Sequence, residues 1–421
     1  MLFLRRIVFV LSLLMTVSVA AQDSKPLTSA TGEWPQFLGP TQNGICTETG
    51  LINEWSAAGP AELWRANIGT GMSTVAVSSG RLFTLAQSKG QQYAIAVDAK
   101  NGDKVWTRDL SAAYRNQMGD GPRATPAVAG DTVFVHTGEG ILAALKTKDG
   151  SVVWQKNLVK ELGGKPSEYG ISSSPLLVGD LVVVQPGVSG GTVVACNQKS
   201  GKIVWKSGSG AAAYSSPVLL NVGGKQQVVA FTGPAALGLE PATGKQLWGY
   251  PFKTDYNCNT ANPIAIGDRV LISSGENHGS ALLSVDGGNA KEEWTSFGRN
   301  SVLRAEWQTP VLLDGDLYGF DNVGSAGPVT NLVCINGKTG ERIWEKKRFG
   351  KGNLIAADGK LFISTMKGKL VLVAASPDGF KELARSREGI VDTTRQAPVI
   401  VGGKLYLRGT QDLVCLNVKQ K

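Results

Sequence analysis

Ten residues with side chains suited to ligand binding lie in loop-like segments along the chain. They combine aromatic rings with basic, acidic and amide groups: Arg123, Tyr169, Tyr214, Asn257, His278, Arg304, Glu306, Trp307, Asn353 and Arg395. Aromatic rings stack on planar groups, and guanidinium groups bind carboxylates through paired hydrogen bonds. Gathered around one opening, these residues would bind a small planar or anionic ligand or a peptide. The alternative is that they are ordinary polar loop residues, solvated or paired with one another.

Three further residues, Glu276, Asn277 and Asp321, are weak candidates for a metal site, since a hard cation such as Ca²⁺ prefers oxygen ligands. The two histidines and five cysteines form no cluster with the spacing of zinc ligands. His136 falls in a strand-like run and is expected to pack, whereas His278 lies in a loop. We assign no catalytic residue, metal or cofactor from these patterns.

One short motif recurs along the chain and sets its organisation. Each copy has a glycine turn followed four residues later by a tryptophan, as in Thr339-Gly340-Glu341-Arg342-Ile343-Trp344. Further copies end at Trp106, Trp154, Trp205 and Trp248, a weaker copy ends at Trp294, and Trp64 has the tryptophan without the turn. Glycine suits a tight turn with positive φ, and the run after it is typical of a short half-buried strand. Because successive tryptophans from Trp64 to Trp344 are 42 to 51 residues apart, we predict an array of small sheets.

Each repeat is predicted to contain four strands. In the third repeat, residues 173–180 form the first strand and its turn, 181–185 the second strand and 192–197 the third, and the fourth ends at Trp205. A proline pair such as Ser174-Pro175 opens most repeats, since proline is tolerated at the beginning of a strand. Counting these openings gives units near 73–106, 124–154, 173–205, 215–248, 261–294, 308–344, 352–383 and 396–418.

The eighth unit lacks a fourth strand, whereas residues 61–67 form a strand ahead of the first unit. Pairing this strand with the last unit would close a ring and remove the exposed sheet edges of an open array. We therefore predict an all-β fold, an eight-bladed β-propeller with the repeated tryptophans and glycines packed between blades. The loops before each first strand, and those between second and third strands, would share one face, where the candidate residues lie.

Residues Ala96-Val97-Asp98-Ala99-Lys100-Asn101-Gly102-Asp103-Lys104-Val105-Trp106 resemble the hallmark of pyrroloquinoline-quinone (PQQ) repeats, Ala-x-Asp-x-x-Thr-Gly-Lys-x-x-Trp. On this motif the whole mature chain is identified as a member of the PQQ-like propellers. It is similar to BamB-like outer-membrane assembly proteins and to quinoprotein dehydrogenases. The motif is specific for the fold and is poor evidence for the cofactor.

The resemblance implies two alternative functions. The one we favour is a non-catalytic, BamB-like scaffold that binds a ligand or an envelope protein through its loop-rich face. The alternative is a PQQ- and Ca²⁺-dependent alcohol or sugar dehydrogenase. Enzymes of that kind carry an adjacent cysteine pair and hold Ca²⁺ through Glu, Asn and Asp side chains, whereas this chain has no adjacent cysteines and its three metal candidates do not match their motif. BamB-type proteins are usually lipid-anchored, and no lipobox cysteine is present here.

The first 21 residues are predicted to be a secretory signal peptide, because Arg5 and Arg6 precede a short apolar run that ends in small residues. Residues 22–60 would form a polar tail and a strap in which Trp34 and Phe37 dock on the body, and residues 61–421 would form the propeller. The product is expected to be a periplasmic or extracellular monomer, with no transmembrane segment in the mature chain.

Composition supports an all-β fold, and the charge distribution bears on the expected partners. The chain has 53 glycines and a net charge of +9, which becomes +7 without Arg5 and Arg6. The basic residues are scattered among acidic ones, so nucleic acid is not an expected partner. Cysteines 196, 334 and 415 fall in strand-like runs and should be buried. Whether the loop residues Cys46 and Cys258 pair is left open.

Overall fold

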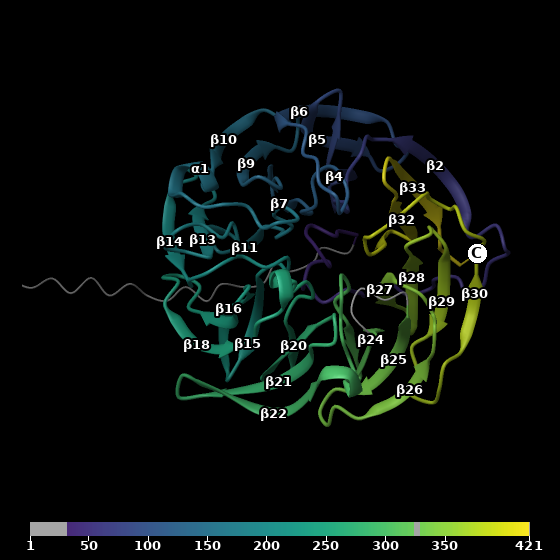
Figure 1. The fold of residues 1–421 in the computed structure, drawn as a ribbon. Coiled ribbons are helices and arrows are strands. Elements are labelled where there is room, and N and C mark those ends of the chain that lie inside the picture. The colour runs from purple at the N-terminus through teal and green to yellow at the C-terminus, as the bar shows by residue number, and fades with distance from the viewer. Residues whose placement is uncertain (1–31, 324–328, 421) are drawn as a thin grey trace, which may run out of the picture.

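The computed structural model describes residues 32–323 and 329–420 and consists of eight sheets. In six of them, four antiparallel strands run in chain order outward from the centre, whereas blade 7 has the additional strand β1 and blade 8 takes its outer strand β2 from ahead of the first blade. The sheets stand as blades around a central axis (Figure 1). This confirms the predicted all-β, eight-bladed propeller. The one α-helix among the described residues is the short α1 (Leu158–Leu162), and 3₁₀ turns lie at Asp255–Asn257 and Gly298–Asn300. The predicted signal peptide lies outside the described residues.

The first four blades follow the predicted units. Blade 1 has β3 (Ala76–Ser78), β4 (Arg81–Ser88), β5 (Gln91–Asp98) and β6 (Lys104–Ala112); blade 2 has β7 (Ala127–Ala129), β8 (Thr132–His136), β9 (Ile141–Lys146) and β10 (Val152–Asn157). Blade 3 has β11 (Leu176–Val178), β12 (Leu181–Val184), β13 (Val193–Asn197) and β14 (Ile203–Ser207); blade 4 has β15 (Val218–Val222), β16 (Lys225–Phe231), β17 (Ala235–Leu239) and β18 (Gln246–Pro251).

The second half of the ring repeats this pattern. Blade 5 has β19 (Ile264–Ile266), β20 (Arg269–Ser274), β21 (Gly279–Asp286) and β22 (Asn289–Phe297); blade 6 has β23 (Val311–Leu313), β24 (Asp316–Asn322), β25 (Thr330–Asn336) and β26 (Arg342–Lys346). Blade 7 has β27 (Gly352–Ala357), β28 (Lys360–Thr365), β29 (Leu370–Ala374) and β30 (Glu382–Arg385), and the short β1 (Ile45–Cys46) pairs with β27 in parallel. Blade 8 has β31 (Val399–Val401), β32 (Lys404–Arg408), β33 (Asp412–Asn417) and β2 (Ala61–Asn67).

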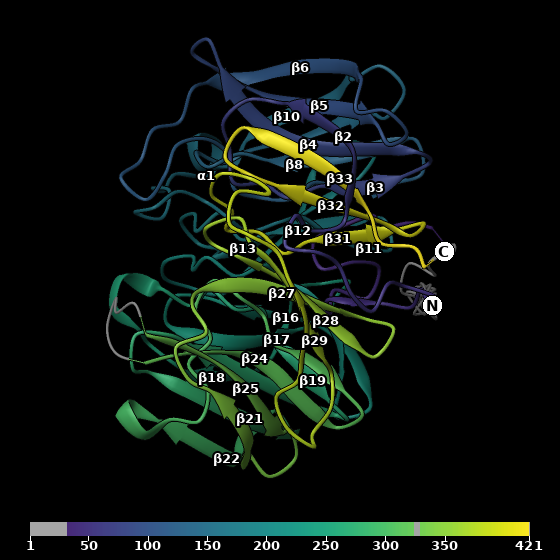
Figure 2. The same cartoon turned by 90° about the vertical axis from the view of Figure 1, so that its right-hand side faces the viewer.

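The ring closes where the two ends of the chain meet. Strand β2 pairs antiparallel with β33, with Arg65 opposite Val414, so it supplies the fourth strand that the last unit lacks. The two strands run side by side in the edge-on view (Figure 2). The predicted closure of the propeller by its N-terminal strand is therefore confirmed.

Glycine and tryptophan form the same contact at five boundaries between blades. Gly102, Gly150, Gly201, Gly244 and Gly340 have φ between +67° and +82°, and a Cβ on any of them would stand 2.4–2.7 Å from the indole ring of the preceding blade. Each of these indoles also donates its N–H to a backbone carbonyl of the next blade, for example Trp154 to Gln198 at 2.7 Å. The repeated residues thus serve the packing role that the sequence predicts.

Trp248 departs from this pattern, although it packs in the core shared by blades 4 and 5. Its indole N–H donates to Gln227 Oε1 of its own blade at 2.7 Å. The reason lies in blade 5, where β21 and β22 are joined by the two-residue turn Gly287-Gly288. A Cβ on Gly288 would meet the Leu247 backbone and no indole ring.

Residues 33–46, which we call the strap, cross the ends of the innermost strands. Trp34 pairs with Val77 of blade 1, the Pro35 carbonyl accepts from Val128 N–H of blade 2 at 2.8 Å, and Gln42 hydrogen-bonds to blade 4. The strap ends as β1 on blade 7. In Figure 1 it is the purple segment in the middle of the ring. It therefore lies across one end of the central channel.

The predicted burial of several cysteines and of one histidine is confirmed. Cys196, Cys334 and Cys415 are fully buried in strands, and His136 is fully buried in β8. Cys46 and Cys258 both carry free thiols, which answers the open question of their pairing. Across the described ranges, no helix is long and apolar enough to cross a membrane.

Candidate ligand-binding site

A cavity of about 540 Å³ occupies the centre of the propeller at its loop-rich face. Its walls come from the loops that precede the first strands and from the β20–β21 loop, and Phe37 of the strap contributes from below. The cavity is therefore open at the loop-rich face and bounded by the strap at the other end.

A ladder of hydrogen bonds between blades fixes where these loops enter the centre. The residue before each opening proline donates its backbone N–H to the side chain of the equivalent residue in the next blade. The bonds run from Thr125 to Ser174, from Ser174 to Ser216, from Ser216 to Asn262 and from Asn262 to Thr309, at 2.8–3.0 Å. A residue before proline is held in an extended conformation, which points its N–H sideways toward the neighbouring blade. The same repeat position thus positions each loop beside the cavity.

One wall of the cavity is aromatic. The rings of Tyr169 and Tyr214 stack with centroids 5.7 Å apart, and Tyr256 lies 6.4 Å from Tyr169. Burial raises the pKa of Tyr214 well above its ordinary value, so its hydroxyl stays protonated. The side chain of Tyr256 is 63% exposed at the rim. This wall offers ring faces and hydroxyl groups to a ligand.

Another part of the wall is basic. Arg123 is buried over the ring of Tyr114, at 4.8 Å, and its two Nη atoms donate to the carbonyls of Gly121 and Gly119. Arg395 donates to the Met118 carbonyl and lies over the ring of Trp307, at 5.2 Å. Burial lowers the pKa of both guanidinium groups, and for Arg123 the charge of Arg395 lowers it further. The two groups contact neighbouring residues, since Arg395 donates to the Met118 carbonyl and Arg123 to the Gly119 carbonyl.

An ion pair lies beside the indole of Trp307. Lys351 Nζ contacts both carboxylate oxygens of Glu306 at 3.0 and 3.1 Å and lies 4.6 Å from the centre of the Trp307 ring. Trp307 has φ +59°, and its backbone N–H donates to Thr260 Oγ1 at 3.0 Å. Lys351 and Arg395 therefore both hold the indole that lines the cavity. Asn353 completes this side by donating to the Arg395 carbonyl at 2.9 Å.

The structure brings seven of the ten predicted residues to this cavity and leaves three outside its lining. The seven are Arg123, Tyr169, Tyr214, Glu306, Trp307, Asn353 and Arg395. Asn257 lies in a 3₁₀ turn with its Oδ1 over Gly233. His278 points Nδ1 at the Gly275 carbonyl, at 3.1 Å. Ligand contact for the seven residues remains a prediction.

Arg304 is the third residue that does not reach the cavity, because it is buried against Asp321. Its Nε and Nη2 atoms donate to the two oxygens of Asp321 at 2.7 and 2.6 Å, and its backbone N–H donates to Oδ1 at 2.9 Å. Arg342 adds a fourth contact to the same carboxylate at 3.0 Å. This cluster links the blade 6 entry loop to β24 and β26, which is a structural arrangement.

The cavity is also lined by residues that are not among the ten candidates for ligand binding. They include Phe37, Met72, Met118, Cys258 and Lys351. Met118 and Lys351 lie in loops just ahead of first strands, so their position in the repeat was the available signal. Burial raises the pKa of the Cys258 thiol to about 12, and Glu276 is the next cause, which makes this thiol a poor nucleophile.

The middle part of the sequence matches a known family. Residues 90–346 match the family model described as outer membrane protein assembly factor BamB. The chain belongs to the BamB family of PQQ-like propellers. It is 25% identical over 327 residues to outer membrane protein assembly factor BamB of Shewanella oneidensis, which covers 72% of this chain and 65% of that relative.

Solved structures show the same fold at low identity. Quinohemoprotein alcohol dehydrogenase from Comamonas testosteroni aligns with a TM-score of 0.70 at 15% identity, over 93% of this chain and 81% of that one. BamB from Moraxella catarrhalis aligns with a TM-score of 0.58 at 14% identity, over 84% of this chain and 99% of that one. At these identities the likeness establishes the fold alone.

Within this BamB-family propeller, the three metal candidates do not form one oxygen-lined site. Glu276 lines the cavity, but Asn277 and Asp321 are not in its lining. Both oxygens of Asp321 accept from arginines, so a cation there would meet two positive charges. No group of three or more His, Cys, Asp and Glu residues suited to a metal ion lies within the described ranges. The donor set therefore does not fit Ca²⁺.

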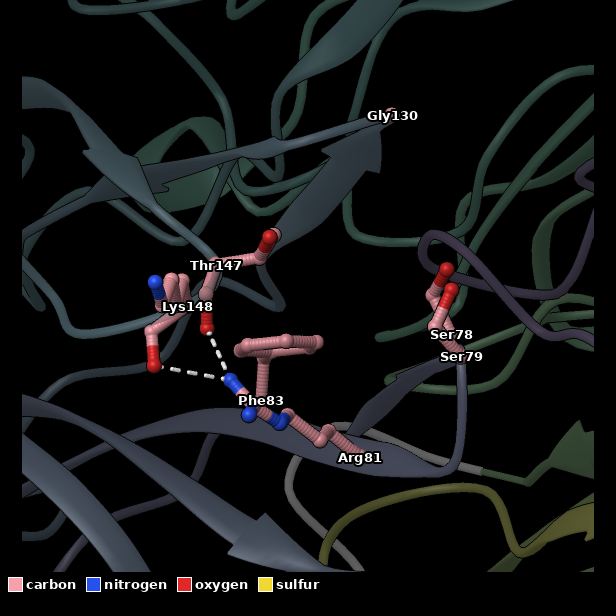
Figure 3. Close-up of a pocket in the computed structure, with 7 residues that line it drawn as sticks. All are labelled: Ser78, Ser79, Arg81, Phe83, Gly130, Thr147 and Lys148. Carbon is pink, nitrogen blue, oxygen red and sulfur yellow. Dashed lines mark hydrogen bonds between the residues drawn. The ribbon is translucent and has the colours of Figure 1, made fainter.

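A smaller hollow of about 250 Å³ lies between blades 1 and 2, on the face of the strand 1–strand 2 turns (Figure 3). Arg81 crosses it and donates to the Thr147 and Lys148 carbonyls at 2.7 and 2.9 Å. Since this guanidinium joins β4 of blade 1 to the β9–β10 turn of blade 2, we attribute the hollow to the blade boundary.

Proposed function

We propose that this propeller is an exported, non-catalytic binding protein that acts in outer-membrane protein assembly. The observation that carries the proposal is the central cavity on the loop-rich face, which combines an aromatic wall with the buried Arg123 and the half-buried Arg395 and is bounded below by the strap. Concave, largely apolar sites with a few convergent polar groups are typical binding sites. The family match supplies the biological setting, since its relatives are assembly factors of the outer membrane.

The described residues around the cavity also favour binding over catalysis. Three of its titratable groups are tied up or poorly suited to proton transfer: Glu306 is paired with Lys351, Tyr214 holds its proton, and the Cys258 thiol has a pKa of about 12. A general acid or base works best with a pKa near the operating pH. We infer that the loop-rich face holds a partner and that the outer faces of the blades provide the rigid frame.

Deletion of the gene, followed by complementation, tests this function. We expect the deletion to lower the amounts of several outer-membrane proteins, and the full-length chain to restore them. A chain with Arg123→Gln and Arg395→Gln should restore them poorly at equal abundance, whereas Glu382→Ala on the outer strand β30 should restore them fully. Unchanged outer-membrane protein levels in the deletion strain would contradict the proposal.

A quinoprotein dehydrogenase is the second candidate, and one observation favours it. Lys351 and Arg395 both lie near the Trp307 ring, at 4.6 and 5.2 Å from its centre, and an indole beside two basic groups would suit a planar anionic cofactor. Titration of the purified protein with PQQ, with and without Ca²⁺, tests it through the melting temperature, because a ligand that binds only the folded state raises that temperature. A saturable shift that requires Ca²⁺ and is lost in Trp307→Ala would support the enzyme. We expect no Ca²⁺-dependent shift.

A further inference from the structure

The central cavity holds charges of both signs that the described residues leave without ionic partners. Arg123 and Arg395 contact backbone carbonyls, a methionine sulfur and aromatic rings, and neither forms an ion pair with a described carboxylate. Glu276 lines the same cavity and forms no ion pair with a described basic side chain. In contrast, Glu306 in the same cavity is neutralised by Lys351. Burial of a charge is costly unless the charge is paired. Arg123 is buried and Arg395 and Glu276 are partly buried, so these three groups favour a charged occupant.

The two arginines form the anionic-ligand end of the cavity. A guanidinium has five N–H donors in a planar fork that matches a carboxylate. Arg123 uses its two Nη atoms on the carbonyls of Gly121 and Gly119, and Arg395 uses Nη1 on Met118, so donors remain on both. The side chain of Arg123 is also buried among protein atoms, which weakens screening by solvent.

The aromatic wall and Glu276 form a cationic-ligand end. Tyr169, Tyr214 and Tyr256 present neighbouring rings, and ring faces attract cations. Glu276 lines the same cavity as these tyrosines. Its loop lies beside the loop that carries Tyr256, because Ser274 Oγ donates to the Cys258 carbonyl at 2.9 Å, and the charge of Glu276 contributes to the raised pKa of Cys258. Burial and the nearby Glu306 also raise the pKa of Glu276 itself. A positively charged group placed here would relieve both effects.

A ligand with only one kind of charge would leave the other end of the cavity without a partner. We propose that the cavity binds a dipolar ligand, with a carboxylate at Arg123 and Arg395 and an ammonium group at Glu276 among the three tyrosines. This inference rests on the proposed function, because it takes the loop-rich face as the binding face. The same chemistry could come from a free zwitterion of amino-acid type or from a protein segment with one acidic and one basic side chain.

Alanine peptides with matched caps test the inference by isothermal titration into the whole mature protein. Trialanine carries both charges, N-acetyl-trialanine only the carboxylate, trialanine amide only the ammonium group, and the doubly capped peptide neither. The set is repeated with two and four alanines, so that the spacing of the charges is varied. We expect the doubly charged peptide of at least one length to bind at least tenfold more tightly than all three capped forms. Equal affinities, or no binding at any length, would overturn the inference.

Two substitutions assign each charge to its end of the cavity. With Arg395→Gln, the peptide with both charges and its amide should bind equally. With Glu276→Gln, the peptide with both charges and its acetylated form should bind equally. Arg395→Lys keeps the charge and should retain part of the preference, and Glu293→Gln on the outer strand β22 is the control that should change nothing. Melting temperatures show whether each variant is folded, and a preference unchanged in both folded Gln variants would overturn the assignment.

One further peptide distinguishes the two sources of the ligand. N-acetyl-Asp-Ala-Lys-amide carries both charges on side chains, so affinity equal to that of the free peptides would indicate a protein segment, and weaker binding would indicate a free zwitterion.

Complementation of the deletion strain separates the inference from the function on which it rests. If the chain restores outer-membrane protein levels but shows no preference for the doubly charged peptide, the dipolar ligand is contradicted and the scaffold function stands. If the deletion leaves outer-membrane protein levels unchanged, the scaffold function itself is contradicted.

Discussion

At the scale of single residues, the charged side chains near the loop-rich face fall into two groups. Arg304 and Asp321 satisfy each other in the interior, whereas Arg123, Arg395 and Glu276 face the cavity without ionic partners among the described residues. Residue type does not distinguish these groups, because both contain arginines and carboxylates in loops of the same kind. The distinction depends on whether a complementary charge from a neighbouring strand lies within reach.

Removing the Asp321 carboxylate should therefore destabilise the fold strongly. In Asp321→Ala, Arg304 would be left buried without its counter-charge, which costs about 3–5 kcal/mol. Glu382→Ala is the matched control, since Glu382 pairs with Arg385 at 2.5 Å but both side chains are about one-third exposed. An exposed pair contributes about 1 kcal/mol or less. Urea unfolding measures both losses, and similar values for the two variants would contradict this account of Asp321.

We predict that the buried His136 lowers the free energy of unfolding in acid. Its ring is fully buried, its Nδ1 lies 3.0 Å from the Ser173 carbonyl, and burial lowers its pKa from 6.5 to about 4. Between these values the unfolded chain binds a proton that the folded chain does not, so stability falls as the pH falls through this window. The slope from this one group is up to about 1.4 kcal/mol per pH unit.

His136→Leu should remove this contribution while the carboxylates of the chain titrate as before. The free energy of unfolding, followed from pH 7 to pH 4 for both proteins, should therefore fall less steeply in the variant. Parallel curves would show that His136 is not the acid-sensitive group.

At the scale of elements, the boundaries between blades depend on glycine turns that lie against indole rings. Gly244 has φ +69°, and a Cβ there would stand 2.4 Å from the Trp205 ring. Gly244→Ala should therefore combine left-handed strain of about 1–2 kcal/mol with overpacking of about 1–3 kcal/mol. Gly224, with φ +73° and nothing within 4 Å of its Cβ position, is the control for strain alone. Equal losses in thermal or urea unfolding would mean that the indole contact is not tight.

Blade 8 differs from the other blades because the chain does not connect its outer strand β2 directly to β33. Trp64 of β2 packs on the Gly102 turn of blade 1, donates to the Ala99 carbonyl of that blade, and lies 6.0 Å from the ring of Tyr406 in blade 8. Trp64→Ala should therefore raise hydrogen exchange throughout β2 and β33. Trp154→Ala, at a boundary inside the chain, should raise exchange less and only locally. Equal effects would argue against a special role for the ring closure.

The elements could be predicted from the sequence because their signals are local and repeated. A glycine turn and a tryptophan recur in most blades, and the missing fourth strand of the last unit identified Ala61–Asn67 as its partner. The site was predictable only in outline, since topology brings all the entry loops to one face. Which side chains point into the cavity depends on pairing between neighbouring loops. The candidates chosen from the sequence therefore included Arg304, which is bound to Asp321. They did not include Lys351, which precedes the seventh unit, where Gly352-Asn353 stands in place of an opening proline.

At the scale of the whole molecule, the propeller presents two different ends. The strap crosses the inner strands at one end, and the cavity opens among the loops at the other. A partner can therefore reach the central residues only from the loop-rich face. The outer strands form the circumference, where a few apolar side chains such as Val204, 50% exposed, face the solvent.

Site-specific crosslinking in living cells tests the binding face most directly. A photoreactive amino acid at Tyr256, which is 63% exposed at the rim of the cavity, is compared with the same amino acid at Val204 on the outer strand β14. We predict an adduct between the Tyr256 position and a protein of outer-membrane assembly, identified by mass spectrometry, and no such adduct from the Val204 position. An adduct only from Val204, or none from either position in cells where the full-length chain restores outer-membrane proteins, would contradict binding through the loop-rich face.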